Sequence, residues 1–155
     1  MYTVVIDTNI LIAATEDLMN AAREVINLVV SGEIKAFASR SILDENRSLL
    51  QQRVVAAAVR SELQGYFMKV ALVRQVRNVM PRLCEDPEDE KFVQCVRAVQ
   101  PEYLITQDRH LRDLENIGAT VVVTPQEFLF TFKRAQDPSG KHEWAGWVRQ
   151  ILKHG

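Results

Sequence analysis

The chain has 155 residues, of which 47% are hydrophobic and 25% charged, and its formal net charge at pH 7 is −1. This length suits one globular domain with a sizeable core, and the composition is typical of a water-soluble protein. The near-zero charge excludes a protein that binds nucleic acid through an overall basic surface, so local clusters would have to supply any such binding.

The sequence predicts a cytoplasmic protein that does not contact a membrane. No apolar run approaches the roughly 18–20 residues that span a bilayer, and the first residues, MYTVVIDTN, lack the pattern of a secretion signal. Cys84 and Cys95 form neither a CxxC pair nor a Cys/His cluster, which is typical of reduced cysteines inside a cell.

The first half of the chain predicts two strands and a long helical region. Residues 2–6 form a continuous apolar run, typical of a strand buried on both faces, and apolar residues then recur at helical spacing from about 9 to 30. A second strand is predicted over 34–39. Ser41 is the expected N-cap of the next helix, and mostly helical sequence with a break at Gly65 continues to about residue 79.

The second half predicts two more strands, separated by helices. Asp86 as N-cap and Pro87 at the first helical position mark the start of one helix. Strands are predicted over 102–106 and 119–124, a short helix closed by Gly118 lies between them, and a last helix comes after the second of these strands. Strands that alternate with helices indicate an α/β fold, a parallel sheet covered by helices on both faces.

We expect one α/β/α sandwich domain over residues 1–132 and a short C-terminal extension over 133–155. The loop QDPSG marks the candidate boundary, and the segment after this loop is too short to form a domain. Trp144 and Trp147 lie at helical spacing in the extension, and we expect them to pack rather than to stack on bases.

Acidic residues come after two of the predicted strands. Asp7 stands directly after the first strand, and Asp108 stands after the third strand, beyond Thr106 and Gln107. Ligands bind at the carboxyl ends of the strands in such sheets, and these ends meet at one edge. We therefore expect both carboxylates to project into one cleft.

Two further acids fall on helix faces that should point inward. Asp89 shares a helical stripe with Phe92 and Val96, and Glu45 lies one turn from Ile42. A charge on a core-facing stripe is costly unless it is paired or bound to a metal ion. Four carboxylates in one cleft would repel each other, which implies a cation, and a set of oxygen ligands suits Mg²⁺ or Mn²⁺.

Each acid also has a purely structural explanation. Asp7, Asp86 and Asp108 can cap the helices that begin after them, and Glu45 and Asp89 can be first-turn acids that the helix dipole favours. A common site explains all five at once, whereas the structural explanations would have to hold independently. The sequence therefore favours a shared acidic site.

These segments together resemble the PIN domain, the nuclease domain of many bacterial and archaeal toxins of toxin–antitoxin pairs. The resemblance covers residues 2–128 and rests on VIDTNILI, SILDENRSLL, DPEDEKFVQC and EYLITQDRHLRDL in this order. One departure is Gln107, where the family usually has the glycine of a TGD turn. Glycine permits a close approach of the backbone, so the substitution bears on the pose of the next acid along the chain.

The resemblance implies functional roles for individual residues. An acidic quartet would hold Mg²⁺ or Mn²⁺ and carry catalysis: Asp7, Glu45, Asp89 and Asp108. Asp86 matches a further acid of the subgroup with a DPxD helix start, and it would add to the metal site. Asn9 and Thr106 match polar residues that support the metal ligands or contact the substrate.

A basic stretch could supply the positive charge that nucleic acid needs beside an acidic cleft. Residues 47–82 hold seven Lys and Arg against the single acid Glu62. Arg47 and Arg53 continue the helix that carries Glu45, so we expect these two to line a substrate groove. A solvated helical face is the alternative explanation for the whole stretch.

By the same resemblance, the chain is expected to be a metal-dependent endoribonuclease, the toxin of a toxin–antitoxin pair, that leaves 5′-phosphate and 3′-hydroxyl ends. The expected partners are an RNA substrate, an inhibitory antitoxin protein and a second copy of the chain. Two alternatives are weaker. A haloacid-dehalogenase-like phosphatase would need a second acid where Asn9 stands. A non-catalytic RNA- or protein-binding module would gain nothing from clustered carboxylates.

Overall fold

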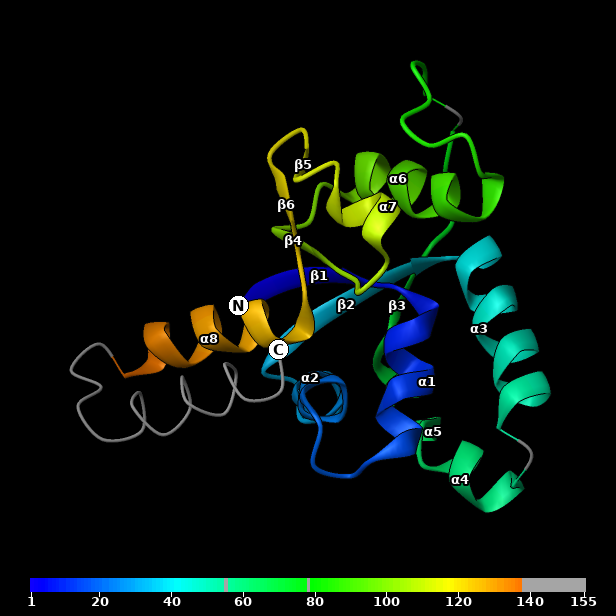
Figure 1. Cartoon of the computed structure of the whole chain (residues 1–155), viewed down its shortest axis with the longest axis vertical. Helices are drawn as coiled ribbons and strands as arrows, with labels where there is room; N and C mark the ends of the chain where they lie inside the picture. Colours follow the sequence, from blue (N-terminus) through cyan, green and yellow to red (C-terminus); the bar gives the residue numbers. More distant parts are fainter. Residues whose placement is uncertain (55, 78, 138–155) are drawn as a thin grey trace.

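The computed structural model describes residues 1–54, 56–77 and 79–137 (Figure 1). Within them, the chain forms a six-stranded sheet with the order β3-β2-β1-β4-β6-β5, in which β5 alone runs antiparallel to its neighbour. The strands are β1 Tyr2–Ile6, β2 Ile34–Ser39, β3 Ala71–Val73, β4 Tyr103–Ile105, β5 Asn116–Ile117 and β6 Thr120–Val123.

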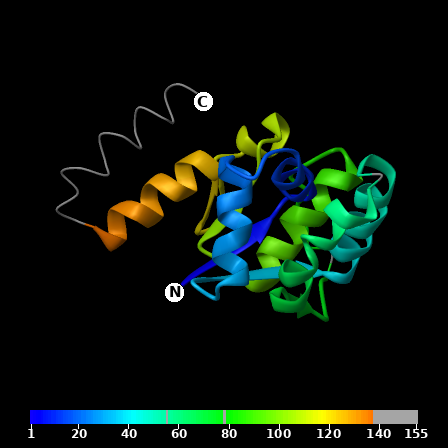
Figure 2. The ribbon, with the colours of Figure 1, turned by 90° about the horizontal axis from the view of Figure 1, so that it is seen from below.

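Helices cover both faces of this sheet, as the sequence predicts. They are α1 Thr8–Glu16, α2 Ala21–Val30, α3 Arg40–Arg53, α4 Ala57–Ser61, α5 Gln64–Lys69, α6 Pro87–Val99, α7 Arg109–Arg112 and α8 Pro125–Gln136. Figure 1 shows α6 and α7 on one side of the sheet and α1, α2 and α8 on the other, and Figure 2 shows α8 beside α2 from below. The α/β fold is thereby confirmed.

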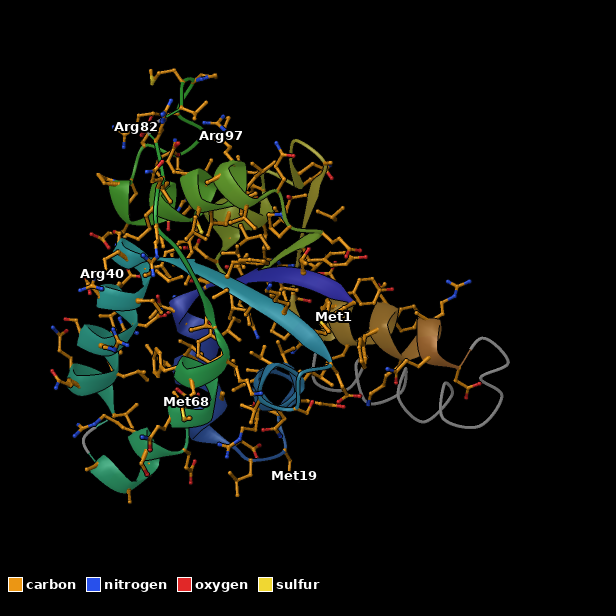
Figure 3. All side chains as sticks on the ribbon, turned by 180° about the vertical axis from the view of Figure 1, so that it is seen from behind. Met1, Met19, Arg40, Met68, Arg82 and Arg97 are labelled. Carbon is orange, nitrogen blue, oxygen red and sulfur yellow. The ribbon has the colours of Figure 1, made fainter. Side chains whose placement is uncertain are left out.

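Side chains fill the space on both faces of the sheet (Figure 3). Val4 of β1 belongs to the core that α1, α2 and α8 cover, and Val5 to the core under α6. Both residues are 0% exposed, which explains why β1 reads as an unbroken apolar run. Within the described ranges, no helix is both long and apolar enough to cross a membrane.

The helical region predicted over 9–30 is two helices, α1 and α2. Asn20 caps the second of them: its side chain accepts a hydrogen bond from the Arg23 N–H (2.8 Å) and donates one to the carbonyl oxygen of Ala13 (2.7 Å). Apolar residues keep their helical spacing across the break, so the pattern alone did not reveal it.

The predicted cap of α3 is wrong by two residues. Ser39, the last residue of β2, is the N-cap, and its hydroxyl accepts a hydrogen bond from the Ile42 N–H (3.2 Å). Ser41 lies inside the helix. The strand therefore passes directly into the helix, which sets the start of α3 at the carboxyl edge of the sheet.

The stretch before residue 79 is less helical than predicted. Two short helices, α4 and α5, precede the edge strand β3, which the sequence did not predict. Gly65 lies inside α5 rather than at a break, and a Cβ there would stand 3.2 Å from Cγ1 of Val30. The glycine thus allows α5 to pack closely against α2.

The short helix predicted to end at Gly118 is also corrected. Helix α7 has four residues, and β5 then pairs with β6 as a hairpin. Gly118 takes the positive φ of +60° in the turn between these two strands. Helix α8 runs through the predicted domain end at residue 132, and most of the predicted extension, with Trp144 and Trp147, lies outside the described residues.

Glu90 of α6 holds the loop that precedes this helix. Its carboxylate is 5% exposed and accepts hydrogen bonds from the N–H groups of Leu83 (3.2 Å) and Cys84 (2.9 Å). The Gln94 side-chain NH₂ donates a hydrogen bond to the same carboxylate (2.8 Å) and another to the carbonyl oxygen of Val79. The Gln94 side-chain oxygen accepts a hydrogen bond from the Val79 N–H. The loop is thereby fixed to α6.

We expect Glu90→Ala to lower the free energy of unfolding by about 1–3 kcal/mol, because it leaves partly buried N–H groups of the loop without their acceptor. Urea unfolding of the variant, beside Glu90→Gln, measures the effect. The glutamine keeps one acceptor oxygen and should lose less. Equal stability of wild-type protein and the alanine variant would show that the loop does not depend on this carboxylate.

Candidate functional site

The ends of β1 and β4 meet at the carboxyl edge of the sheet. The Asp7 N–H donates a hydrogen bond to the carbonyl oxygen of Ile105 (3.0 Å), and the Thr106 N–H donates to that of Val123 (2.9 Å). The strand ladder thus continues one residue past each strand. This pairing places Asp7 beside Thr106, whose hydroxyl donates to Oδ2 of Asp7 (2.7 Å).

Thr106 also connects Asp7 with Asp108. Its hydroxyl oxygen, which is fully buried, accepts a hydrogen bond from the Asp108 N–H (2.9 Å). Asp108 in turn caps α7 by accepting from the His110 N–H (2.8 Å). The cap and the shared-site explanations are therefore compatible, because Asp108 caps α7 through Oδ1 while its carboxylate also interacts with that of Asp89.

The first turn of α6 brings Asp89 to these strand ends. Burial and then the carboxylate of Asp108 raise the pKa of Asp89 to about 6, and Asp86 and Asp7 also contribute to the rise. Burial is also the main cause that raises the pKa of Asp7, opposed by the Thr106 hydrogen bond, and Asp108 adds to the rise. Three aspartates from separate elements thus share one electrostatic site, which we call the aspartate cluster: Asp7, Asp89 and Asp108.

Glu45 of α3 interacts with Thr8, the residue after Asp7, and with Lys91 of α6. Its Oε2 accepts a hydrogen bond from the hydroxyl of Thr8 (2.5 Å), and its Oε1 forms an ion pair with Nζ of Lys91 (3.1 Å). Lys91 also pairs with Glu88 (2.6 Å). Burial and then Glu88 raise the pKa of Glu45, while Thr8 and Lys91 lower it.

Three residues around Glu45 were missed from the sequence: Thr8, Asn46 and Lys91. The side-chain amide of Asn46 donates to the Thr8 hydroxyl (2.7 Å), so Asn46, Thr8 and Glu45 form a chain of hydrogen bonds. Asn46 is 0% exposed, and its Oδ1 has no hydrogen-bond partner among the described residues. A polar residue on the inward stripe between Leu43 and Leu50 was the available signal.

Two other predicted site residues, Asp86 and Asn9, lie at the margin of the aspartate cluster. Asp86 is an exposed N-cap that accepts from the Glu88 N–H (2.9 Å), and it acts on Asp89 through its charge. Asn9 is exposed and contacts Asp7 through its backbone N–H (3.4 Å).

The two arginines predicted to line a groove are both exposed on α3. The guanidinium of Arg47 lies over the ring of Phe67, 5.3 Å from its centre. Arg53 lies in the last turn of α3, at the far end of the helix from its N-cap Ser39. Arg47 thus covers an aromatic ring of α5, which the sequence did not predict.

The donor chemistry of the aspartate cluster fits a hard divalent cation. All donors are carboxylate oxygens, and burial together with the charge of Asp108 raises the pKa of both Asp7 and Asp89, so a bound cation would offset the cost of keeping these acids ionised. In the part of the chain that the structure describes, no group of three Asp, Glu, His or Cys side chains is already arranged to hold a metal ion.

A comparison with protein families matches the segment of the chain that contains these residues. A family model described as the PIN domain matches residues 3–110, the segment that contains the aspartate cluster and Glu45. Comparison with curated proteins gave no match. PIN domains are generally nucleases that use divalent metal ions. The fold and the matched length together show that the chain belongs to the PIN domain family.

Proposed function

We propose that the chain is a metal-dependent endoribonuclease with Mg²⁺ or Mn²⁺ as cofactor. Its catalytic residues would be Asp7, Glu45, Asp89 and Asp108. The observation that carries this proposal is the aspartate cluster, in which burial and then the carboxylate of Asp108, with smaller contributions from Asp86 and Asp7, raise the pKa of Asp89 to about 6. Clustered carboxylates lower the stability of a fold when no cation binds them, so their presence favours a cation site.

The residues of the site have distinct roles in this proposal. Asp7, Asp89 and Asp108 would hold the metal, and Asp86 would add negative charge beside them. A bound divalent ion would lower the pKa of water and neutralise charge on the phosphate. Thr106 orients Asp7 through its hydroxyl.

Glu45, held by Thr8 and Lys91, would complete the metal site or orient the attacking water. The products would carry 5′-phosphate and 3′-hydroxyl ends. We also propose that Asn9 contacts the substrate at the exposed start of α1.

We extend the proposal to the biological role suggested by the family resemblance. The chain would be the cytoplasmic toxin of a toxin–antitoxin pair and would act as a homodimer. An antitoxin protein would inhibit it by covering the aspartate cluster. A basic side chain of that partner would suit the negative charge of the cluster.

A non-catalytic RNA- or protein-binding module is the second candidate. The ion pair between Lys91 and Glu45 favours it, because this pair neutralises one acid without a metal ion. The two candidates differ in a measurable way, since the binding module requires neither metal binding nor cleavage.

The test is cleavage of a mixed pool of structured RNAs by the purified protein with Mn²⁺, with Mg²⁺ and with EDTA. We expect cutting with either metal and none with EDTA. The Asp7→Asn variant, purified in the same way, should show only background cutting. If the wild-type protein neither cuts RNA nor binds Mn²⁺ in calorimetry, the nuclease proposal fails and the binding module replaces it.

A further inference from the structure

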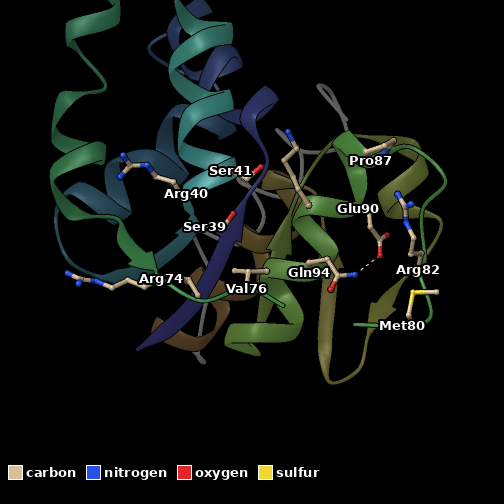
Figure 4. A pocket seen from close by; sticks show the side chains of 12 residues that line it. Ser39, Arg40, Ser41, Arg74, Val76, Met80, Arg82, Pro87, Glu90 and Gln94 are labelled. Carbon is tan, nitrogen blue, oxygen red and sulfur yellow. Dashed lines mark hydrogen bonds between the residues drawn. The ribbon is translucent and has the colours of Figure 1, made fainter. Parts of the chain in front are cut away.

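A pocket of about 620 Å³ opens at the carboxyl edge of the sheet, where β2 and β3 end. Figure 4 shows the side chains that line it. Its walls come from the junction of β2 with α3, from the segment after β3, and from α6. These two helices also carry Glu45 and Asp89. Lys91 lines the pocket and binds Glu45 (3.1 Å), so it stands at the border between the pocket and the acids.

The pocket is positively charged. Four cations line it: Arg40, Arg74, Arg82 and Lys91. Among the described lining residues the one acid is Glu90, whose carboxylate already accepts hydrogen bonds from the loop and from Gln94.

The arginines of the pocket are available to a ligand. Arg40 has a weak, exposed pair with Asp44 (3.8 Å), and within the described ranges neither Arg74 nor Arg82 forms an ion pair. Arg74 and Arg82 are both exposed. The pocket therefore presents uncompensated positive charge to an anionic ligand.

The rest of the wall combines apolar side chains with uncharged polar ones, and the described lining residues include no aromatic side chain. The apolar residues are Val73, Val76, Met80 and Pro87, and the polar ones are Ser39, Ser41 and Gln94. Bases that bind by stacking need aromatic or other planar surfaces, whereas phosphates need cations and ribose hydroxyls need hydrogen-bond partners. The chemistry of the wall thus fits a sugar–phosphate backbone and predicts little base specificity.

We propose that this pocket binds the backbone of a single-stranded RNA next to the phosphodiester that is cut, an inference that rests on the proposed nuclease function. A strand lying across both features would place one phosphate at the aspartate cluster and its neighbours against Arg74 and Arg82. Lys91 would offset the repulsion between the RNA and Glu45. An acidic segment of a protein partner would also suit the cations, but it would gain nothing from the adjoining acids.

The test compares two double variants that remove the same charge. Arg74→Gln/Arg82→Gln changes the pocket. Lys35→Gln/Arg134→Gln is the control, because Lys35 lies near the amino end of β2, paired with Thr3, and Arg134 in the last turn of α8. Fluorescence anisotropy gives the affinity for a short labelled single-stranded RNA in EDTA at several salt concentrations.

We expect the pocket variant to bind RNA about tenfold more weakly than the wild-type protein. The slope of its log affinity against log salt concentration should be smaller in magnitude by about 1.4, since each lost phosphate contact accounts for about 0.7 of that slope. The control variant should bind like the wild-type protein. Equal affinity of the two variants would overturn the proposal. Unchanged RNA binding with weakened binding of an oligoglutamate peptide would also overturn it, and would assign the pocket to an acidic protein segment.

A separate readout distinguishes failure of this inference from failure of the proposed function. Mn²⁺-dependent cleavage of the same RNA by the wild-type protein tests the aspartate cluster, whereas binding in EDTA tests the pocket without metal. Cleavage by the wild-type protein with no binding defect in the pocket variant rejects the pocket alone. Absence of cleavage with a clear binding defect rejects the nuclease and retains the pocket as an RNA-binding site.

Discussion

The Asp89→Asn variant should lose RNA cleavage and gain stability at the same time. We expect cleavage to fall by more than about 100-fold, because loss of even an outer partner of a metal ligand costs about 10–100-fold. The gain in stability arises from the pKa of Asp89, which burial and its neighbours raise to about 6. A residue kept only for the fold would not show these opposite effects.

The sign of the stability change depends on pH. In the unfolded chain Asp89 ionises near its ordinary pKa of 3.8, so between about pH 4 and pH 6 the native state binds more protons. The free energy of unfolding therefore falls as the pH rises through this window. The Asp89→Asn variant has no carboxyl group to titrate at this position, so it should not show this fall. Because solvent screens a partly exposed carboxylate, we expect a gain of about 1 kcal/mol near pH 7.5 and almost none below about pH 4.

Urea unfolding in EDTA at both pH values, together with RNA cleavage in Mn²⁺, measures the two effects. Asp44→Asn is the matched control, because Asp44 is an exposed acid directly before Glu45, and it should change neither property. An Asp89→Asn variant that cuts RNA at the wild-type rate would remove Asp89 from the site. An inactive variant with lowered stability near pH 7.5 would show that Asp89 supports the fold instead.

The closeness of Asp7 and Asp108 could be predicted from the sequence because both lie just past the end of a strand. A residue next to a strand end is placed by that strand, and parallel strands bring their carboxyl ends together. The start of α6 could also be predicted from neighbouring residues alone, because Asp86 and Pro87 fix where the helix begins. Local signals of this kind place the acids without knowledge of distant contacts.

Contacts between distant segments could not be predicted in the same way. The ion pair between Glu45 and Lys91 joins residues 46 positions apart, and nothing in either segment indicates the other. Strand β3 has three residues, too few to show a pattern, and it forms by pairing with the end of β2. Lys91 and the β3 residue Val73 both line the basic pocket, so the pocket could be recognised only in the folded chain.

The arrangement of strand ends also gives the aspartate cluster its own support. Thr106 is fully buried and uses one hydroxyl group twice, as donor to Asp7 (2.7 Å) and as acceptor from the Asp108 N–H (2.9 Å). The hydroxyl lowers the pKa of Asp7 against the effect of burial, so it helps keep this acid ionised. A single atom thus controls the charge of one acid and the position of another.

We therefore expect Thr106→Val, which keeps the shape but removes the hydroxyl, to reduce cleavage by about 10–100-fold. The partly buried Asp108 N–H would lose its acceptor, at a cost of about 1–3 kcal/mol in the free energy of unfolding. The pKa of Asp7 would rise further, so the remaining activity should require a higher pH than in the wild-type protein.

Thr106→Ser separates the hydroxyl from the packing of the side chain. Serine keeps both hydrogen bonds and loses a methyl group, so it should retain most of the cleavage activity while it lowers stability by about 1 kcal/mol. Cleavage rates across pH and urea unfolding of both variants measure the difference. If serine and valine reduce cleavage equally and leave its pH dependence unchanged, Thr106 fills space, and some other group must orient Asp7.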